Sequence, residues 1–511
     1  MRKLFFLATL IILASCQKEP QEKPITVNSV SVTGGLIAGK LSDDQSIKVF
    51  KGIPFAAPPV GDLRWKAPQP VIPWEGILDA KDNPASFTQN PPVPFFAWSE
   101  EFLIPKEPIS EDGLYLNVWT PDEKTTESLP VMVWIHGGGF SGGSGTVPLY
   151  DGEALAKKGI VVVTINYRLG IFGFLAHPEL SLENPDGVSG NYGILDQIAA
   201  LEWVKNNIKA FGGDPSNVTI AGQSAGAFSV NALVVSPKAK GLFQKAIAES
   251  GGMVSRGSGL VSGLKSAEIR NAEILAENGI TSLESLRQIS ADSLLKISGR
   301  FSPVVDGVII PPVKKAIETG QYSDVPLLTG WNADDMVGLG PEESPALFRK
   351  NAQKQYGGRA GEYLELFPAN DEEQLLATKQ LIAELFFGLQ NYTWAKLQAQ
   401  YGTYPSYLYY FTRIPPGEPN YGAFHSAEFA YALHTLNYWN RPFEEVDFQL
   451  EETMSSYWVN FIKTGNPNGD GLPEWPQFDS ENPLVIEFGE EVKSTAVPHW
   501  RQLKFLESLS Q

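Results

Sequence analysis

The chain has 511 residues, enough for a large buried core, and its 43% hydrophobic and 19% charged residues are typical of a globular enzyme. Acidic residues outnumber basic ones by 58 to 40, which gives a formal net charge of -18. So acidic a chain lacks the basic surface that would offset phosphate repulsion, and nucleic acid is therefore excluded as a partner.

The N-terminus has the pattern of a secretory signal. A short basic segment, 1–3, precedes an apolar run at 4–14 that is too short to span a membrane. The following Leu-Ala-Ser-Cys resembles a bacterial lipobox, which implies cleavage before Cys16 and lipid attachment to its thiol; the alternative is an ordinary signal peptide cut nearby. We expect a signal peptide at 1–15, a polar tether at 16–28 and export to the bacterial cell envelope, at the outer membrane on its periplasmic or surface face.

Strand-like and helix-like segments alternate through the first half of the chain. Continuous apolar runs predict buried strands and helical spacing predicts a helix between them, with strands at 130–135, 159–166, 218–222 and 246–250 and the helix at 196–210. This alternation predicts a central, mostly parallel sheet covered by helices on both faces. Residues from about 255 to 410 are predicted to be mostly helical and could cover the catalytic end of the sheet.

The most informative motif is a serine between two glycines. Ser224 follows a predicted strand and precedes a predicted helix, with Gly222 and Gly226 in the G-x-S-x-G pattern of a nucleophile elbow. Larger side chains at the two glycine positions would collide across so tight a turn. The N–H group of Ala225 opens the helix and can point at a developing oxyanion. The motif therefore predicts acyl-transfer chemistry.

A serine nucleophile needs a base and an acid, and the order in α/β-hydrolases is serine, carboxylate, histidine. His425 and His434 both lie downstream of the serine, and the glycine-containing loop around His425 favours it. Asp334 and Asp335 follow a predicted strand at 325–330, and both are candidates for the acid.

A glycine-rich loop supplies the third requirement of the chemistry. His136 is followed by three glycines and Phe140, directly after the predicted strand at 130–135. This is the HGGG-type loop of esterases and lipases, in which backbone N–H groups approach the substrate carbonyl oxygen closely.

Taken together, the motifs make the chain resemble the type-B carboxylesterases, a family that includes the cholinesterases and the catalytically inactive neuroligins. The matching stretches are FKGIPFAAPPVGDLR at 50–64, EDGLYLNV at 111–118, HGGGF at 136–140, NYRLG at 166–170, FGGDP at 211–215, GQSAG at 222–226, PVVDG at 303–307, GAFH at 422–425 and TGNPN at 464–468. The resemblance implies one α/β-hydrolase domain at 29–511, with Ser224 as nucleophile, His425 as base and Asp335 as acid. It also implies that Gly138, Gly139 and Ala225 donate to the oxyanion.

The chain departs from the family pattern at three places. Gln223 stands where the family has glutamate, which argues against a choline-type cationic substrate, and Asp335 stands where the family more often has glutamate. Phe87 and Gly113 stand where the family has a disulfide, and Cys16 is the only cysteine in the chain. The loop between those two positions borders the substrate gorge in the family, so its aromatic side chains either line that gorge with Gln223 or only anchor the loop: Phe95, Phe96, Trp98 and Phe102.

The sequence thus predicts a serine carboxylic-ester hydrolase that works through a covalent acyl-enzyme on small to medium esters. It is expected to need no metal and no organic cofactor, and to meet a membrane only through its lipid anchor. Two alternatives stay open: a lipase acting on longer acyl esters, and a non-catalytic adhesion or binding protein on the same fold.

Overall fold

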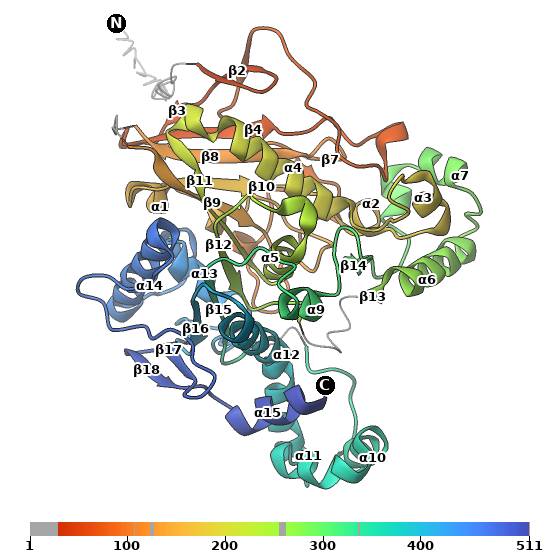
Figure 1. Cartoon of the computed structure of the whole chain (residues 1–511), viewed down its shortest axis with the longest axis vertical. Coiled ribbons are helices and arrows are strands. Elements are labelled where there is room, and N and C mark those ends of the chain that lie inside the picture. The colour runs from red at the N-terminus through yellow and green to blue at the C-terminus, as the bar shows by residue number, and fades with distance from the viewer. Residues whose placement is uncertain (1–28, 107, 123–126, 255–261, 336–337, 510–511) are drawn as a thin grey trace, which may run out of the picture.

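A computed structural model describes residues 29–106, 108–122, 127–254, 262–335 and 338–509 (Figure 1). The predicted signal peptide and tether at 1–28, with the predicted lipid attachment at Cys16, therefore lie outside the described residues. Within those ranges, none of the helices combines the length and the apolar character needed to cross a bilayer.

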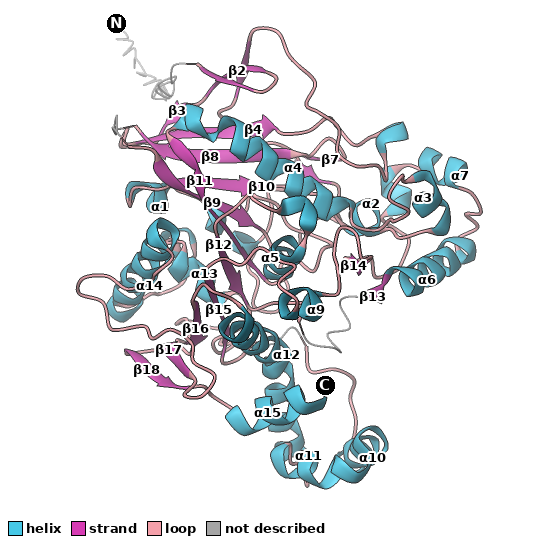
Figure 2. Ribbon diagram, viewed as in Figure 1, coloured by secondary structure: helices cyan, strands magenta, loops and turns pink. Residues whose placement is uncertain are grey.

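An eleven-stranded sheet runs through the molecule (Figure 2), and its strand order is β18-β17-β16-β15-β12-β11-β9-β10-β8-β4-β3. The seven strands from β17 to β10 in that order are parallel, and antiparallel strands complete both edges. Their bounds are β3 Lys40–Leu41, β4 Ile47–Pro54, β8 Tyr115–Pro121, β9 Leu129–Ile135, β10 Val161–Ile165, β11 Gly213–Gln223, β12 Lys245–Glu249, β15 Leu327–Asn332, β16 Ser406–Phe411, β17 Leu484–Phe488 and β18 Val492–Ala496.

Successive side chains of each central strand enter two different cores, because strand side chains alternate between the faces of a sheet. In β9, Val131, Val133 and Ile135 pack on one face with helices α4 (Tyr192–Asn207), α5 (Ala225–Val235), α9 (Val313–Glu318) and α12 (Glu372–Tyr401). Met132 and Trp134 pack on the other face with α1 (Glu153–Lys157), α13 (Ala427–Ala432) and α14 (Glu445–Thr464). Both faces are therefore covered, which confirms the predicted α/β-hydrolase architecture.

Most predicted elements have bounds close to the observed ones. The helix expected at 196–210 begins four residues earlier, at Tyr192, and its last residues form a separate 3-10 turn, Ile208–Phe211. Gly212 ends this turn in the left-handed region, at φ 79°, where glycine is the favoured residue. The chain then enters β11, whose last residue immediately precedes Ser224.

The remaining elements surround this core. Three short strands form a small N-terminal sheet, two further two-stranded pairs lie outside the main sheet, and the predicted helical region contributes most of the peripheral helices (Figure 1). The strands are β1 Val30–Val32, β2 Gly35–Ala38, β5 Ile77–Asp79, β6 Ser86–Phe87, β7 Ile109–Ser110, β13 Ser262–Gly263 and β14 Val304–Val305; the helices are α2 Gly170–Phe174, α3 Pro178–Glu183, α6 Leu264–Glu277, α7 Leu283–Gln288, α8 Ala291–Leu294, α10 Pro345–Tyr356, α11 Ala360–Leu366 and α15 Trp500–Leu509.

Candidate active site

Ser224 is the single residue between strand β11 and helix α5, and its backbone is strained. It has φ 56° and ψ -123°, a conformation that non-glycine residues adopt rarely and that is concentrated at functional sites. The flanking glycines face the end of β9: a Cβ at Gly222 would lie 2.7 Å from the carbonyl oxygen of Ile135, and a Cβ at Gly226 would overlap the same atom. The tight strand-turn-helix predicted from the glycine spacing is therefore confirmed, and contact with β9 explains both glycines.

The imidazole of His425 pairs with Asp335 and not with its neighbour Asp334. The distance from His425 Nδ1 to Asp335 Oδ1 is 2.5 Å, and Asp335 Oδ2 accepts from the backbone N–H of Asn332 at 3.1 Å. Asp334 instead accepts the backbone N–H of Ala423 at 2.7 Å. The structure thus chooses between the two aspartates that the sequence left open.

The other downstream histidine lies away from this pair. His434 follows α13, and its Nδ1 lies 3.3 Å from the hydroxyl oxygen of Ser455 on α14. Its ring is absent from the cavity that Ser224 and His425 line. The chain around His425 takes its shape from Gly422, at φ 71°, where a Cβ would overlap the carboxylate of Asp334.

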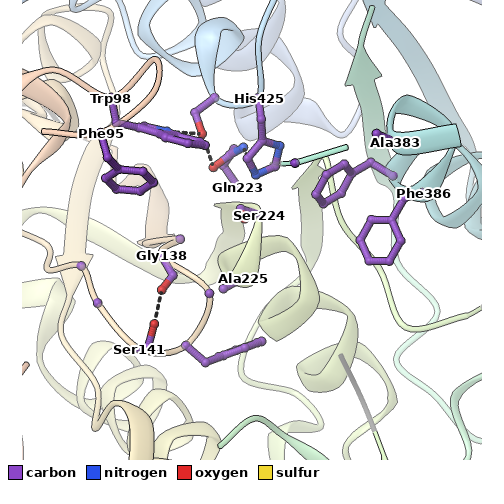
Figure 3. Close-up of a pocket in the computed structure, with 18 of the residues that line it drawn as sticks. Phe95, Trp98, Gly138, Ser141, Gln223, Ser224, Ala225, Ala383, Phe386 and His425 are labelled. Atoms are coloured by element: carbon purple, nitrogen blue, oxygen red, sulfur yellow. Dashed lines mark hydrogen bonds between the residues drawn. The ribbon is translucent and has the colours of Figure 1, made fainter. Parts of the chain in front are cut away.

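Ser224 and His425 line the same cavity and lie close to each other there, with Gln223 beside both (Figure 3). The Nε2 atom of His425 lies 3.3 Å from the side-chain nitrogen of Gln223, the residue before the serine. Among the described residues, no hydrogen bond joins the Ser224 hydroxyl to the imidazole. The structure therefore brings Asp335, His425 and Gln223 into direct contact and places Ser224 beside them with its hydroxyl uncommitted to the ring.

The glycine-rich loop lies against the same cavity, with Gly138 at φ 105° and Gly139 at φ 61°. Neither of these two N–H groups has a protein acceptor within the part of the chain that the structure describes. Ala225 also lines the cavity, and as the first residue of α5 its N–H has no intrahelical acceptor. Gln89 holds the far end of the loop, because its side chain accepts from the N–H of Gly143 and donates to its carbonyl, both at 2.8 Å.

His136, the first residue of the glycine loop, is buried and has a structural role. Burial lowers its pKa to about 4, so the ring is neutral at physiological pH. Its Nδ1 lies 2.8 Å from the carbonyl oxygen of Gly137, and its ring stacks on Tyr167 at 4.4 Å between centroids. The Tyr167 hydroxyl in turn donates to the His136 carbonyl at 2.9 Å. These contacts fix the start of the loop that carries Gly138 and Gly139.

The cavity has a volume of about 1320 Å³ and mostly apolar walls, which come from α12 and from the aromatic loop at 91–104. Phe95, Trp98 and Phe102, for which the sequence left lining and anchoring open, lie at its wall, and Gln223 also lines it. Phe96 does not line it, so that prediction was wrong: this side chain is 46% exposed and packs on the ring of Tyr421, 4.6 Å away. Its backbone is left-handed, at φ 48°, and its ring also lies 5.7 Å from that of Trp98.

Two buried glutamates that the sequence analysis missed lie behind the His425–Asp335 pair. Burial, together with the charge of Asp335, raises the pKa of Glu428 to about 7, and Asn332 donates to its carboxyl at 2.5 Å. Burial likewise raises the pKa of Glu249 well above its ordinary value, and Trp458 donates to it at 2.8 Å. Glu428 stands three residues after His425, and Glu249 ends β12; an acid at the end of a buried strand is the signal that could have indicated this pair.

The two positions where the family has a disulfide are neighbours in this structure. A Cβ on Gly113 would lie 2.8 Å from the Cα of Phe87, and the strands β6 and β7 pair beside them. Close main-chain packing occupies the place of the covalent link.

A strained serine at a strand-to-helix turn, on a mostly parallel sheet with helices on both faces, defines a serine hydrolase of the α/β-hydrolase class. The profile of the Carboxylesterase family matches residues 26–359 and 339–505. The chain belongs to this family, and it is a carboxylic ester hydrolase.

Individual relatives are similar in sequence to nearly the whole chain. The sequence is 37% identical to Fumonisin B1 esterase of Sphingopyxis macrogoltabida, over 88% of this chain and 85% of that protein. It is 36% identical to Para-nitrobenzyl esterase of Bacillus subtilis (strain 168), over 92% and 96% of the two chains. A solved structure of a PNB esterase is similar with a TM-score of 0.81 and 34% identity, covering 94% of this chain and 99% of that one.

Proposed function

We propose that Ser224, His425 and Asp335 form the catalytic triad of this ester hydrolase. The observation that carries the proposal is the 2.5 Å contact between His425 and Asp335 at the wall of the cavity into which the strained serine opens. Asp335 holds the proton of the ring on Nδ1, so Nε2 faces the cavity as the base. A rotation of the Ser224 side chain toward Nε2 completes the triad, and hydrogen bonds of this kind are often formed only when substrate binds.

The reaction has two halves. Ser224 Oγ attacks the ester carbonyl carbon while its proton passes to His425, and the carbonyl oxygen becomes an oxyanion near the N–H groups of Gly138, Gly139 and Ala225. Each such donor contributes about 3 kcal/mol in comparable sites. His425 then gives the proton to the departing alcohol, which leaves an acyl-enzyme. Water attacks the acyl group with His425 again as base, and the carboxylic acid and free serine are released.

The size and walls of the cavity support medium-sized, largely apolar esters as substrates. Its volume of about 1320 Å³ exceeds that of most small-ligand sites. The aromatic rings of Phe95 and Trp98 at one side and Phe386 at the other offer stacking surfaces for an aromatic alcohol or acyl group (Figure 3). A series of nitrophenyl esters of increasing acyl length will separate this preference from that of a lipase.

The decisive experiment is to incubate the protein with a fluorophosphonate probe and locate the adduct by mass spectrometry. We expect the label on Ser224, and we expect Ser224→Ala to lower kcat on a nitrophenyl ester by at least about 10⁴-fold, since triad members act as a unit. Ser229→Ala is the control, because Ser229 is also a buried serine but does not line the cavity, and its hydroxyl bonds Gln197 and the carbonyl oxygen of Ala225. An unlabelled wild-type protein, or an active Ser224→Ala variant, contradicts the proposal.

We further propose, from the N-terminal sequence pattern, that Cys16 carries a lipid and anchors the enzyme in the cell envelope. Labelled palmitate fed to the expressing bacteria should appear on the wild-type protein and not on Cys16→Ser. Equal membrane fractions for the two proteins contradict the anchor and leave the esterase assignment untouched.

A further inference from the structure

A continuous series of side-chain contacts connects the aromatic loop to the base. The indole N–H of Trp98 donates to Ser426 Oγ at 3.3 Å, and Ser426 donates to Gln223 Oε1 at 3.1 Å. The side-chain nitrogen of Gln223 then lies 3.3 Å from His425 Nε2, whose Nδ1 meets Asp335. Apart from Trp98, which borders the cavity, all of these side chains are buried.

The chemistry of the two ends fixes the direction of every hydrogen bond in this series. An indole nitrogen can only donate, so the Ser426 hydroxyl accepts from Trp98 and has its own proton free for the Gln223 carbonyl. Because the Gln223 side-chain oxygen accepts from Ser426, the side-chain N–H of Gln223 points toward the imidazole ring of His425. Because the Nδ1–H group of His425 donates to Asp335, Nε2 of the neutral ring is an acceptor, and the Gln223 amide is a matching donor.

We propose that Gln223 is a positioning residue that holds His425 in its neutral, Nε2-accepting form, and that Trp98 and Ser426 orient the Gln223 amide from the cavity wall. This inference rests on the proposed role of His425 as the base. An amide N–H stabilises the neutral ring and opposes the charged one, because a protonated Nε2 and the amide would each present a hydrogen to the other. Nε2 has a single lone pair, so the Ser224 hydroxyl displaces the amide from it when the triad forms. By favouring the neutral ring before that step, Gln223 extends activity toward acid pH.

The other groups around the ring act in the opposite sense. Asp335 follows β15, Glu428 lies on α13 and interacts with the His425 charge, and Glu249 ends β12 beside Glu428. All three carboxyl groups favour a charged imidazole when they are ionised. Phe387 of α12 covers the ring face at 4.4 Å and brings no charge. Among the described side chains that the ring contacts, Gln223 is thus the one whose hydrogen bond favours the neutral form.

The test is the pH dependence of kcat/KM on a soluble nitrophenyl ester for wild type, Gln223→Glu and Gln223→Met. A carboxylate in place of the amide accepts from the charged ring, so the midpoint of the acid limb should rise by about one pH unit or more in Gln223→Glu. Gln223→Met removes the donor without adding charge, so its midpoint should rise by less. The same order should appear in the NMR titration of the ring in a Ser224→Ala background, where activity is not the readout.

Two single changes test the outer part of the series. Trp98→Phe keeps an aromatic ring and removes the donor to Ser426, so it should shift the midpoint in the same direction as Gln223→Met. Phe95→Leu is the matched control on the same loop, because Phe95 has no polar side-chain atom; it should alter KM and leave the midpoint in place.

The possible outcomes distinguish failure of the inference about Gln223 from failure of the proposed function. Coincident midpoints for wild type and Gln223→Glu overturn the inference while hydrolysis by Ser224 stands. If Gln223→Glu does not fold, an unmoved midpoint in Trp98→Phe and Gln223→Met overturns it equally. A wild-type protein that neither hydrolyses esters nor takes a phosphonate label contradicts the proposed function itself.

Discussion

The two sides of the cavity are held by different kinds of force. On the nucleophile side, the turn that carries Ser224 owes its geometry to backbone contacts, since Gly222 and Gly226 press against the end of β9. On the base side, His425 is placed by hydrogen-bonding side chains from several elements, with Asp335 and Gln223 at its two nitrogens. Steric exclusion tolerates no added atom, whereas a hydrogen-bonded ring can be adjusted by changing its partners. Substitutions on the nucleophile side should therefore lower stability as well as activity, whereas substitutions on the base side should act mainly on the titration and tautomer of the ring.

On the base side of the cavity, the largest loss of activity should come from substitution of Asp335, the proposed acid of the triad. Asp335→Asn loses the carboxylate that holds the Nδ1 proton, and kcat should fall about 10⁴-fold because the ring then adopts the wrong tautomer. Asp334→Asn is the matched control, since Asp334 bonds only backbone at Ala423 among the described contacts. Steady-state kinetics on a nitrophenyl ester measure both variants, and similar losses in the two would contradict the assignment of Asp335.

On the nucleophile side, Gly226→Ala places a methyl group on the Ile135 carbonyl oxygen. We expect the free energy of unfolding to fall by about 3 kcal/mol and kcat by about 100-fold, because the elbow must move away from β9. Gly361→Ala is the control, since that glycine has open space around it on helix α11. Urea unfolding and kinetics report the two effects, and a fully stable, active Gly226→Ala would show that the elbow is not sterically fixed.

A smaller, pH-dependent effect should come from Glu428, whose pKa burial raises to about 7. In the unfolded chain this carboxyl ionises near its ordinary pKa of 4.5, so its favourable contribution is complete below that pH and is lost as pH rises through 7. Glu428→Gln cannot ionise, so between pH 5 and 8 it should lose less stability than wild type, by about 3 kcal/mol.

Urea unfolding of both proteins at the two pH values measures this difference. Because the charge of Glu428 also raises the pKa of Glu249, the two titrations are coupled, and the same pair compared in a Glu249→Gln background isolates the titration of Glu428. Parallel losses of stability in wild type and Glu428→Gln would mean that Glu428 carries its charge in the folded protein throughout this range.

The backbone side of the site was largely predictable from sequence, and the side-chain side was not. The spacing of Gly222, Ser224 and Gly226 suffices for the elbow because glycine is required wherever main chains touch. Asp334 and Asp335 both follow the same strand, and only the capture of Asp334 by a backbone amide of the histidine loop decides between them. Such a contact depends on how separate loops meet, which local patterns do not encode.

The other features of the site that the sequence did not predict also depend on contacts between distant segments of the chain. Trp98 and Ser426 are 328 residues apart in the chain, so no spacing rule connects them. Phe96 does not line the cavity because its ring packs on Tyr421, and the aromatic run around Phe96 does not indicate a contact with so distant a segment of the chain. The two buried glutamates are spread over a strand end and a helix, and each by itself is an ordinary acidic residue.

The close contact of Phe87 with Gly113 has a consequence for where this enzyme can be made and can work. Its aromatic loop is tied by main-chain packing and by Gln89, so no cystine has to form before the cavity is complete. Folding is thereby independent of oxidising machinery, and reductants such as dithiothreitol have no bond to cleave in the folded domain. The same polypeptide can mature in the cytosol of an expression host or outside the cell without a change in its architecture.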